Sequence, residues 1–171
     1  MSITSTVPNE ILSFRGPEDN KGLMYIIFDK PRTREIYFKT YNSFHLLNLP
    51  YVYYIIHLYN DKFCDLSIYL SNRKPRSLSD RCLTRFDFLN CCEGEACLGN
   101  KAKSFLAKKS IDDIIRLIPR LFWESTFNDL YGIPCDLPLR NKISKKELLN
   151  SCVNYSFESI NDIKDEYLSN M

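Results

Sequence analysis

The chain has 171 residues, 13% of them aromatic, and a formal net charge of +2. This length suits one domain with a sizeable core and a small appendage, and so small a charge does not require a nucleic-acid partner. No apolar run approaches the ~18 residues that span a bilayer, so we expect no membrane partner. No signal-peptide pattern is visible near the start, which favours a cytoplasmic location.

The first half of the chain has the composition of β-strands. Residues 1–22 are polar, and we expect them to form an N-terminal arm. Runs rich in β-branched and aromatic residues follow at 24–28, 35–41, 51–59 and 63–70, and residues 60–62 are a hairpin turn between the last two. These runs predict a four-stranded antiparallel meander.

Helix signals dominate the second half. Ser110 is an N-cap with two acids in the following turn, and apolar residues then recur at helical spacing as far as Phe122. Pro119 should kink or divide this helix, and Trp123 should cover the sheet. Two short helices are expected at 144–153 and 156–168. The predicted fold is α+β, with helices packed on one face of the meander, a main domain at 23–140 and a C-terminal helical appendage at 141–171.

A polar turn between these halves carries the one hint of chemistry. Gly94 allows a tight reversal, which would bring the Asn90 side chain close to the Cys97 thiol. A thiolate can attack an acyl group while an amide stabilises the oxyanion. Lys101 and Lys103 are near in sequence and would favour the thiolate.

The order of short motifs resembles the ubiquitin-conjugating (UBC-like) superfamily, above all its divergent prokaryotic and phage-encoded members. Those enzymes place a His-Pro-Asn motif shortly before a Gly-x-x-Cys-Leu segment. Here Phe88-Leu89-Asn90 stands at the first position and Gly94-Glu95-Ala96-Cys97-Leu98 at the second, so the His-Pro pair is absent. Leu49-Pro50, Cys97-Leu98-Gly99 and the 122–128 segment match further motifs of the divergent members, and the likeness covers roughly residues 24–130.

The resemblance implies a cysteine-dependent acyl transferase. Cys97 would accept the carboxyl terminus of a ubiquitin-like protein from an activating enzyme as a thioester, and Asn90 would steady the oxyanion. No cofactor is needed for that transfer. A second hypothesis is a non-enzymatic binding or assembly subunit of a phage or mobile-element complex, with the same fold but a merely retained Cys97. The abundance of Lys, Asn, Ile and Tyr favours such an AT-rich origin, and hence a host cytoplasm.

Residues 73–109 form a basic section with nine basic and four acidic residues. It is either a contact surface for nucleic acid or an acidic protein, or a solvated loop surface. The candidate contact residues are Arg73, Lys74, Arg76, Arg81, Arg85, Lys101 and Lys103.

The seven cysteines are odd in number and irregularly spaced, so a disulfide framework is not expected. Cys82, Cys92 and Cys97 could offer three zinc ligands, but no C-x-x-C pair or nearby histidine supports a metal site. His57 lies in an apolar run and should be packed there, whereas His45 should lie in a loop. A Cys-His protease is therefore poorly supported.

Overall fold

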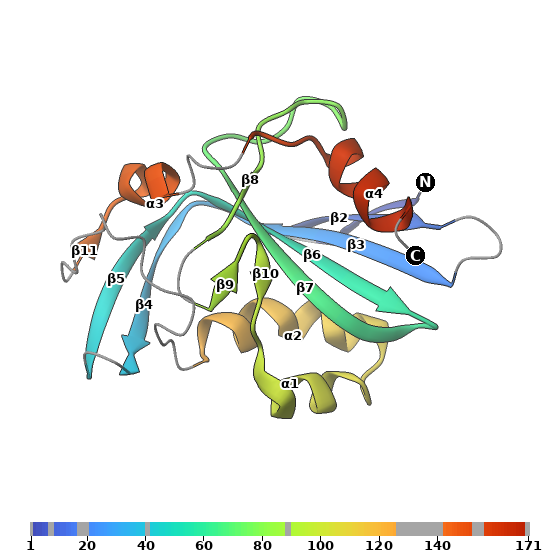
Figure 1. Cartoon of the computed structure of the whole chain (residues 1–171), viewed down its shortest axis with the longest axis horizontal. Helices are drawn as coiled ribbons and strands as arrows, with labels where there is room; N and C mark the ends of the chain where they lie inside the picture. The colour runs from blue at the N-terminus through green and yellow to red at the C-terminus, as the bar shows by residue number, and fades with distance from the viewer. Residues whose placement is uncertain are drawn as a thin grey trace.

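A computed structural model describes residues 2–6, 9–16, 21–39, 42–87, 90–125, 142–151 and 156–169. The main sheet of this part of the chain is antiparallel (Figure 1). Its strands are, in spatial order, β1 (Ser2–Thr6), β2 (Asn9–Arg15), β3 (Gly22–Asp29), β6 (Tyr51–Tyr59), β7 (Lys62–Ser71), β10 (Glu95–Ala96) and β9 (Cys91–Cys92), with β8 (Thr84–Arg85) also paired to β7. A smaller sheet contains β11 (Lys142–Ile143), β5 (Ser43–Leu49) and β4 (Arg32–Phe38).

Strands β6 and β7 form the centre of the molecule, as the sequence predicts. They pair antiparallel around a turn at Asn60 and Asp61, which adopt φ values of 54° and 60° without a glycine. Positive φ at both central residues is the geometry of a type I′ hairpin turn. Strand β6 is buried along almost its whole length, because helices cover both faces of the sheet (Figure 1).

The α+β class is confirmed, but the four-stranded meander with helices on one face is wrong. The polar segment expected to be an arm contains β1 and β2, which extend the main sheet beyond β3. Of these two, only β1 is an edge strand, since β2 lies between β1 and β3; the segment is polar and poor in the β-branched and aromatic runs that predict strands. The hairpin β4–β5 belongs to the second sheet, and Pro50, which lacks a backbone donor, stands where the chain passes into β6.

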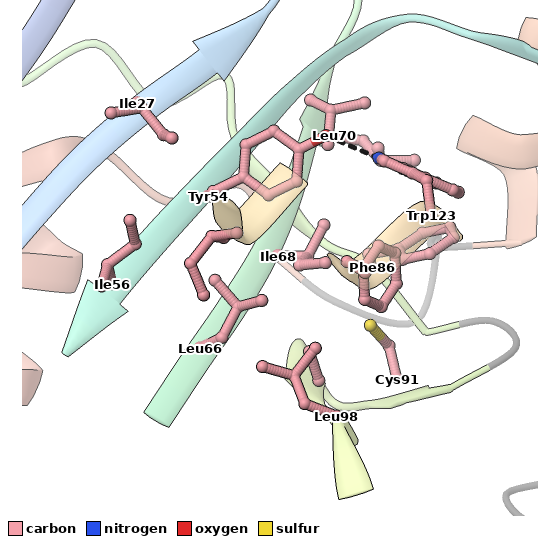
Figure 2. Close-up of a cluster of buried hydrophobic side chains, with 14 of the residues drawn as sticks. Ile27, Tyr54, Ile56, Leu66, Ile68, Leu70, Phe86, Cys91, Leu98 and Trp123 are labelled. Atoms are coloured by element: carbon pink, nitrogen blue, oxygen red, sulfur yellow. Dashed lines mark hydrogen bonds between the residues drawn. The ribbon is translucent and has the colours of Figure 1, made fainter. Parts of the chain in front are cut away.

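Helices α1 (Gly99–Leu106) and α2 (Ile111–Trp123) cover one face of the main sheet (Figure 1). Ser110 caps α2 by accepting a hydrogen bond from the Asp113 backbone N–H, as predicted. The helix continues through Pro119 as one element. Figure 2 shows the core beneath it, where the Trp123 indole N–H donates to the Tyr54 hydroxyl at 2.5 Å. Trp123 thus covers the sheet, as expected.

Helix α4 (Ile160–Ser169) lies on the opposite face, where Ile160 and Ile163 pack with Met24 and Ile55. Helix α3 (Lys145–Ser151) lies beside β5. Helix α3 lies within the predicted 144–153 range, whereas α4 begins at Ile160, four residues after the predicted start, because Glu158 pairs with Leu83. Helices on two faces explain why the apolar runs in β3 and β6 are continuous rather than alternating.

Candidate functional site

The predicted turn is a short hairpin at the edge of the main sheet. Strands β9 and β10 pair Glu95 with Cys92 and Ala96 with Cys91. The reversal uses Glu93 and Gly94 at φ values of 51° and 90°, so the expected role of this glycine is confirmed. Cys91 is buried in the core (Figure 2), and its neighbour Cys92 is exposed.

The hairpin brings Asn90 and Cys97 together. The Cys97 backbone N–H donates to the Asn90 carbonyl oxygen at 2.6 Å, which continues the β9–β10 ladder by one residue. Asn90 is 6% exposed, and its side-chain amide donates to Ser125 Oγ at 3.3 Å. Cys97 is partly exposed. The two residues are neighbours, but this hydrogen bond directs the amide to the end of α2.

Cys97 stands directly before the N-terminus of α1. The N-cap position is Leu98, which provides no side-chain hydrogen bond, and the first turn contains no acidic residue. The backbone N–H groups of a first helical turn carry a partial positive charge that favours an anion nearby. Cys97 is therefore the residue directly before a helix N-terminus that no side chain caps.

A cleft of about 470 Å³ opens at this thiol. Lys103 at its rim pairs with Asp65 at 3.1 Å, and Arg85 forms ion pairs with two glutamates beyond the cleft. Partial desolvation, together with the nearby carboxylates of Asp87, Glu93 and Glu95, raises the pKa of the exposed Cys92 thiol. The lining residues are Asp65, Arg85, Cys92, Glu93, Glu95, Ala96, Cys97, Gly99, Asn100 and Lys103.

A second cavity of about 230 Å³ adjoins the first under α4, and His57 lines it. His57 is 4% exposed, its Nε2 lies 3.0 Å from Ser67 Oγ, and its ring stacks on Tyr167 with centroids 3.6 Å apart. Burial lowers its pKa to about 3. The packed His57 was predicted, but His45 is a buried residue of β5 and not a loop residue. Neither histidine lines the Cys97 cleft.

Much of the charge of the basic section is paired within the chain. Arg73 binds Asp80 through both guanidinium NH groups, at 2.5 and 2.9 Å, and this contact holds the pKa of that carboxyl well below its usual range. Arg81 pairs with Asp162 at 3.2 Å. Arg85 pairs with Glu158 at 2.8 Å and with Glu166 at 2.6 Å. Lys103 is likewise paired, so four of the seven candidate contact residues have acidic partners.

Several residues of the predicted motifs lie outside the described part of the chain. They are Phe88 and Leu89, the 126–128 part of the helix motif, and Cys135 and Cys152. Cys82 is buried in the cluster beneath α4, whereas Cys92 and Cys97 line the cleft. Within the described ranges no three metal-ligating side chains gather.

Sequence reasoning missed the place of α4 beside this site. The acidic partners of Arg85, Glu158 and Glu166, lie more than 70 positions further along the chain, and a single sequence does not show which distant charges form a pair.

Comparison with family models, curated proteins and solved structures gave no match. Among the described helices, none is long and apolar enough to cross a bilayer.

Proposed function

We propose that this protein carries the carboxyl terminus of a ubiquitin-like modifier as a thioester on Cys97 and transfers it to an amine. The observation that carries the proposal is the position of Cys97, partly exposed at the rim of a cleft and directly before an uncapped helix N-terminus. The antiparallel sheet that precedes Cys97 agrees with the UBC-like resemblance at the level of α+β class only.

The first step is a thioester exchange. The Cys97 thiolate attacks the carbonyl carbon of the incoming thioester, the tetrahedral oxyanion collapses, and the thiolate of the activating enzyme leaves. Asn90, whose carbonyl oxygen accepts from the Cys97 N–H, turns its side-chain amide from Ser125 Oγ to the oxyanion in this step. The first-turn N–H groups of α1 add a favourable field at the same place.

The second step transfers the acyl group to an amine. A neutral amine attacks the Cys97 thioester, loses a proton, and the thiolate is released. Among the described residues, Glu93 and Glu95 line the cleft and are exposed. Their carboxylates attract an ammonium group, which favours a lysine side chain as the acceptor.

A synthetic peptide thioester with a C-terminal glycine tests this function without the cognate modifier. Incubated with the purified protein and quenched in acid, it should add one peptide by intact mass. The adduct should be lost on treatment with hydroxylamine. Cys97→Ser should give either no adduct or a slowly formed oxyester, whereas Cys64→Ser, at an exposed thiol of β7, should behave as the wild type. An adduct that persists undiminished in Cys97→Ser would refute the proposal.

A binding or assembly subunit is the second candidate, and one observation favours it. Strand β5 presents Phe44 and Leu46 to solvent, with exposed fractions of 61% and 38%. Exposed apolar side chains on a short sheet are typical of protein contacts. On this alternative, peptide loading fails, and Phe44→Ser together with Leu46→Ser abolishes an assembly seen by size-exclusion chromatography.

A further inference from the structure

Two solvent-accessible thiols, not one, line the candidate cleft. Cys92 comes from β9 and Cys97 follows β10 directly. We propose that Cys92 and Cys97 form a reversible intramolecular disulfide, which makes the cleft a peroxide-responsive redox site. This redox chemistry is separate from the thioester function, and its test needs no modifier protein.

The hairpin register places these thiols on one face. Cys92 pairs with Glu95, and Cys97 lies two residues beyond Glu95 along the same strand direction. Side chains two residues apart on a strand share a face, so Cys97 is the diagonal neighbour of Cys92, while Cys91 and Ala96 point into the core. Figure 2 shows the Cys91 sulfur among the buried side chains, which leaves Cys92 as the partner for Cys97.

The distance to be closed is small. Diagonal neighbours on paired strands lie about 7–8 Å apart, and disulfides span about 4.4–6.8 Å between Cα atoms, so the gap is on the order of 1 Å. Strands β9 and β10 contain two residues each, and among the described strands β9 pairs with β10 alone. Strand β10 is held to β7 by the Glu95–Ser67 pair and by the Ile68 N–H bond to the Gly94 carbonyl, so the closing movement falls to the Cys92 and Cys97 side chains and to the outermost strand β9.

The two cysteines have different roles in the oxidation. Cys97, beside the helix N-terminus, attacks hydrogen peroxide, so that its sulfur gains an oxygen as a sulfenic acid and water is released. The Cys92 thiolate then attacks the Cys97 sulfur, the S–S bond forms, and hydroxide leaves and is protonated to water. In total, two thiols lose two electrons and two protons, and one peroxide is reduced to two waters.

The environment supports this order of events. Partial desolvation and the carboxylates of Asp87, Glu93 and Glu95 raise the pKa of Cys92 and disfavour its thiolate as the first target of peroxide. Once Cys97 is a sulfenic acid, the nearby Cys92 needs only a fraction of thiolate to react, because the reaction is intramolecular. A disulfide would also remove the thiol that the proposed function requires, and a thiol reductant would restore it.

Peptide mapping after peroxide treatment tests the proposal. The reduced protein is exposed to a small excess of hydrogen peroxide with dimedone present, quenched, digested without reductant and analysed by mass spectrometry. The wild type should yield a Cys92–Cys97 cross-linked peptide that dithiothreitol removes. Cys92→Ser should instead accumulate the dimedone adduct of Cys97, at least about tenfold above the wild type, because no neighbouring thiol consumes the sulfenic acid.

Cys64→Ser is the matched control, since it removes an exposed thiol that does not line the cleft. It should form the cross-link as the wild type does. Equal dimedone labelling of Cys97 in the wild type and Cys92→Ser would overturn the proposal. Disulfides between molecules in place of the internal cross-link would overturn it as well. Failure of peptide loading with an intact cross-link would instead refute only the thioester function.

Discussion

Asn90 has a structural contact and a proposed chemical role, and substitutions can separate them. Its amide donates to Ser125 Oγ, and both residues would lose that contact in either alanine variant. Only Asn90→Ala, however, removes the donor that we propose for the oxyanion. Asn90→Ala should therefore slow peptide loading of Cys97 by about 10²–10³-fold, the usual effect of one lost oxyanion donor, while Ser125→Ala loads at nearly the wild-type rate.

Single-turnover loading rates, with circular dichroism to verify folding, check this prediction. If the two variants slow loading equally, Asn90 acts through the fold alone. The sequence predicts that the Asn90 side chain lies close to the Cys97 thiol. The backbone bond confirms that the two residues are neighbours, but the Asn90 side chain is buried and donates to Ser125. No sequence pattern indicates Ser125 as a partner, because that contact depends on how the end of α2 lies on the hairpin.

At the scale of elements, Arg85 determines how firmly α4 lies beside the cleft. Its side chain is 25% exposed and binds Glu158 and Glu166, and Glu158 is itself only 14% exposed. Loss of the guanidinium leaves a largely buried carboxylate without its cation, which is costly. Arg85→Met should therefore raise hydrogen exchange in α4 by at least about tenfold, since bonds to charged groups contribute about 1.5–3 kcal/mol.

Arg81→Met is the control for this experiment. Arg81 also pairs with α4, through Asp162, but its side chain is 68% exposed. Exposed pairs contribute little, so exchange in α4 should change by less than about fivefold. Equal acceleration in the two variants, measured by mass spectrometry on the α4 peptides, would show that Arg85 has no special part in docking.

The sequence predictions of strands and helices were correct where the local periodicity or capping pattern was strong. Strands β6 and β7, the Ser110 cap and the C-terminal helices were read correctly from periodicity and capping residues. Strands β1 and β2 were missed because their segment is largely polar, and β5 was missed because its residues do not alternate strictly between apolar and polar. The side of the sheet that each helix covers depends on packing between distant segments, which one sequence does not encode locally.

At the scale of the whole molecule, buried His57 makes stability depend on pH. Its pKa is lowered to about 3 in the folded protein, and the ordinary value is 6.5. Between these pH values the His57 side chain is protonated in the unfolded chain and neutral in the folded protein. The free energy of unfolding therefore has its full value above pH ~6.5 and decreases as the pH falls, by up to about 1.4 kcal/mol per pH unit.

Urea unfolding between pH 4.5 and 7.5 measures this effect, with endpoints chosen to bracket the ordinary histidine pKa of about 6.5. As the pH is lowered, the free energy of unfolding of the wild type should fall more steeply than that of His57→Gln. The difference between the two slopes should correspond to the uptake of about one proton on unfolding. Proton NMR of the wild type gives a second reading, because the His57 ring signals should not titrate in this range. A His57 titration near its ordinary pKa would contradict the buried placement.

The charge of the basic section depends on the folded chain as a whole, because acidic residues distant in the sequence pair with it. The sequence count of nine basic and four acidic residues is correct, but Glu158, Asp162, Glu166 and Asp65 lie outside that count. Contact with nucleic acid remains a prediction. Such contact would give binding that weakens steeply as the salt concentration rises. Replacing Arg73, Lys74 and Arg76 by alanine should make this salt dependence less steep.

The reactivity of the thiols in the native protein decides whether Cys97 is an activated nucleophile. The reduced protein is treated with iodoacetamide at neutral pH, and the alkylation rate of each cysteine is followed by peptide mass spectrometry. Cys97 should react fastest, ahead of the exposed Cys64 and of Cys92, whose pKa is raised by partial desolvation and nearby carboxylates. A Cys97 that reacts no faster than Cys64 would contradict an activated nucleophile at this cleft.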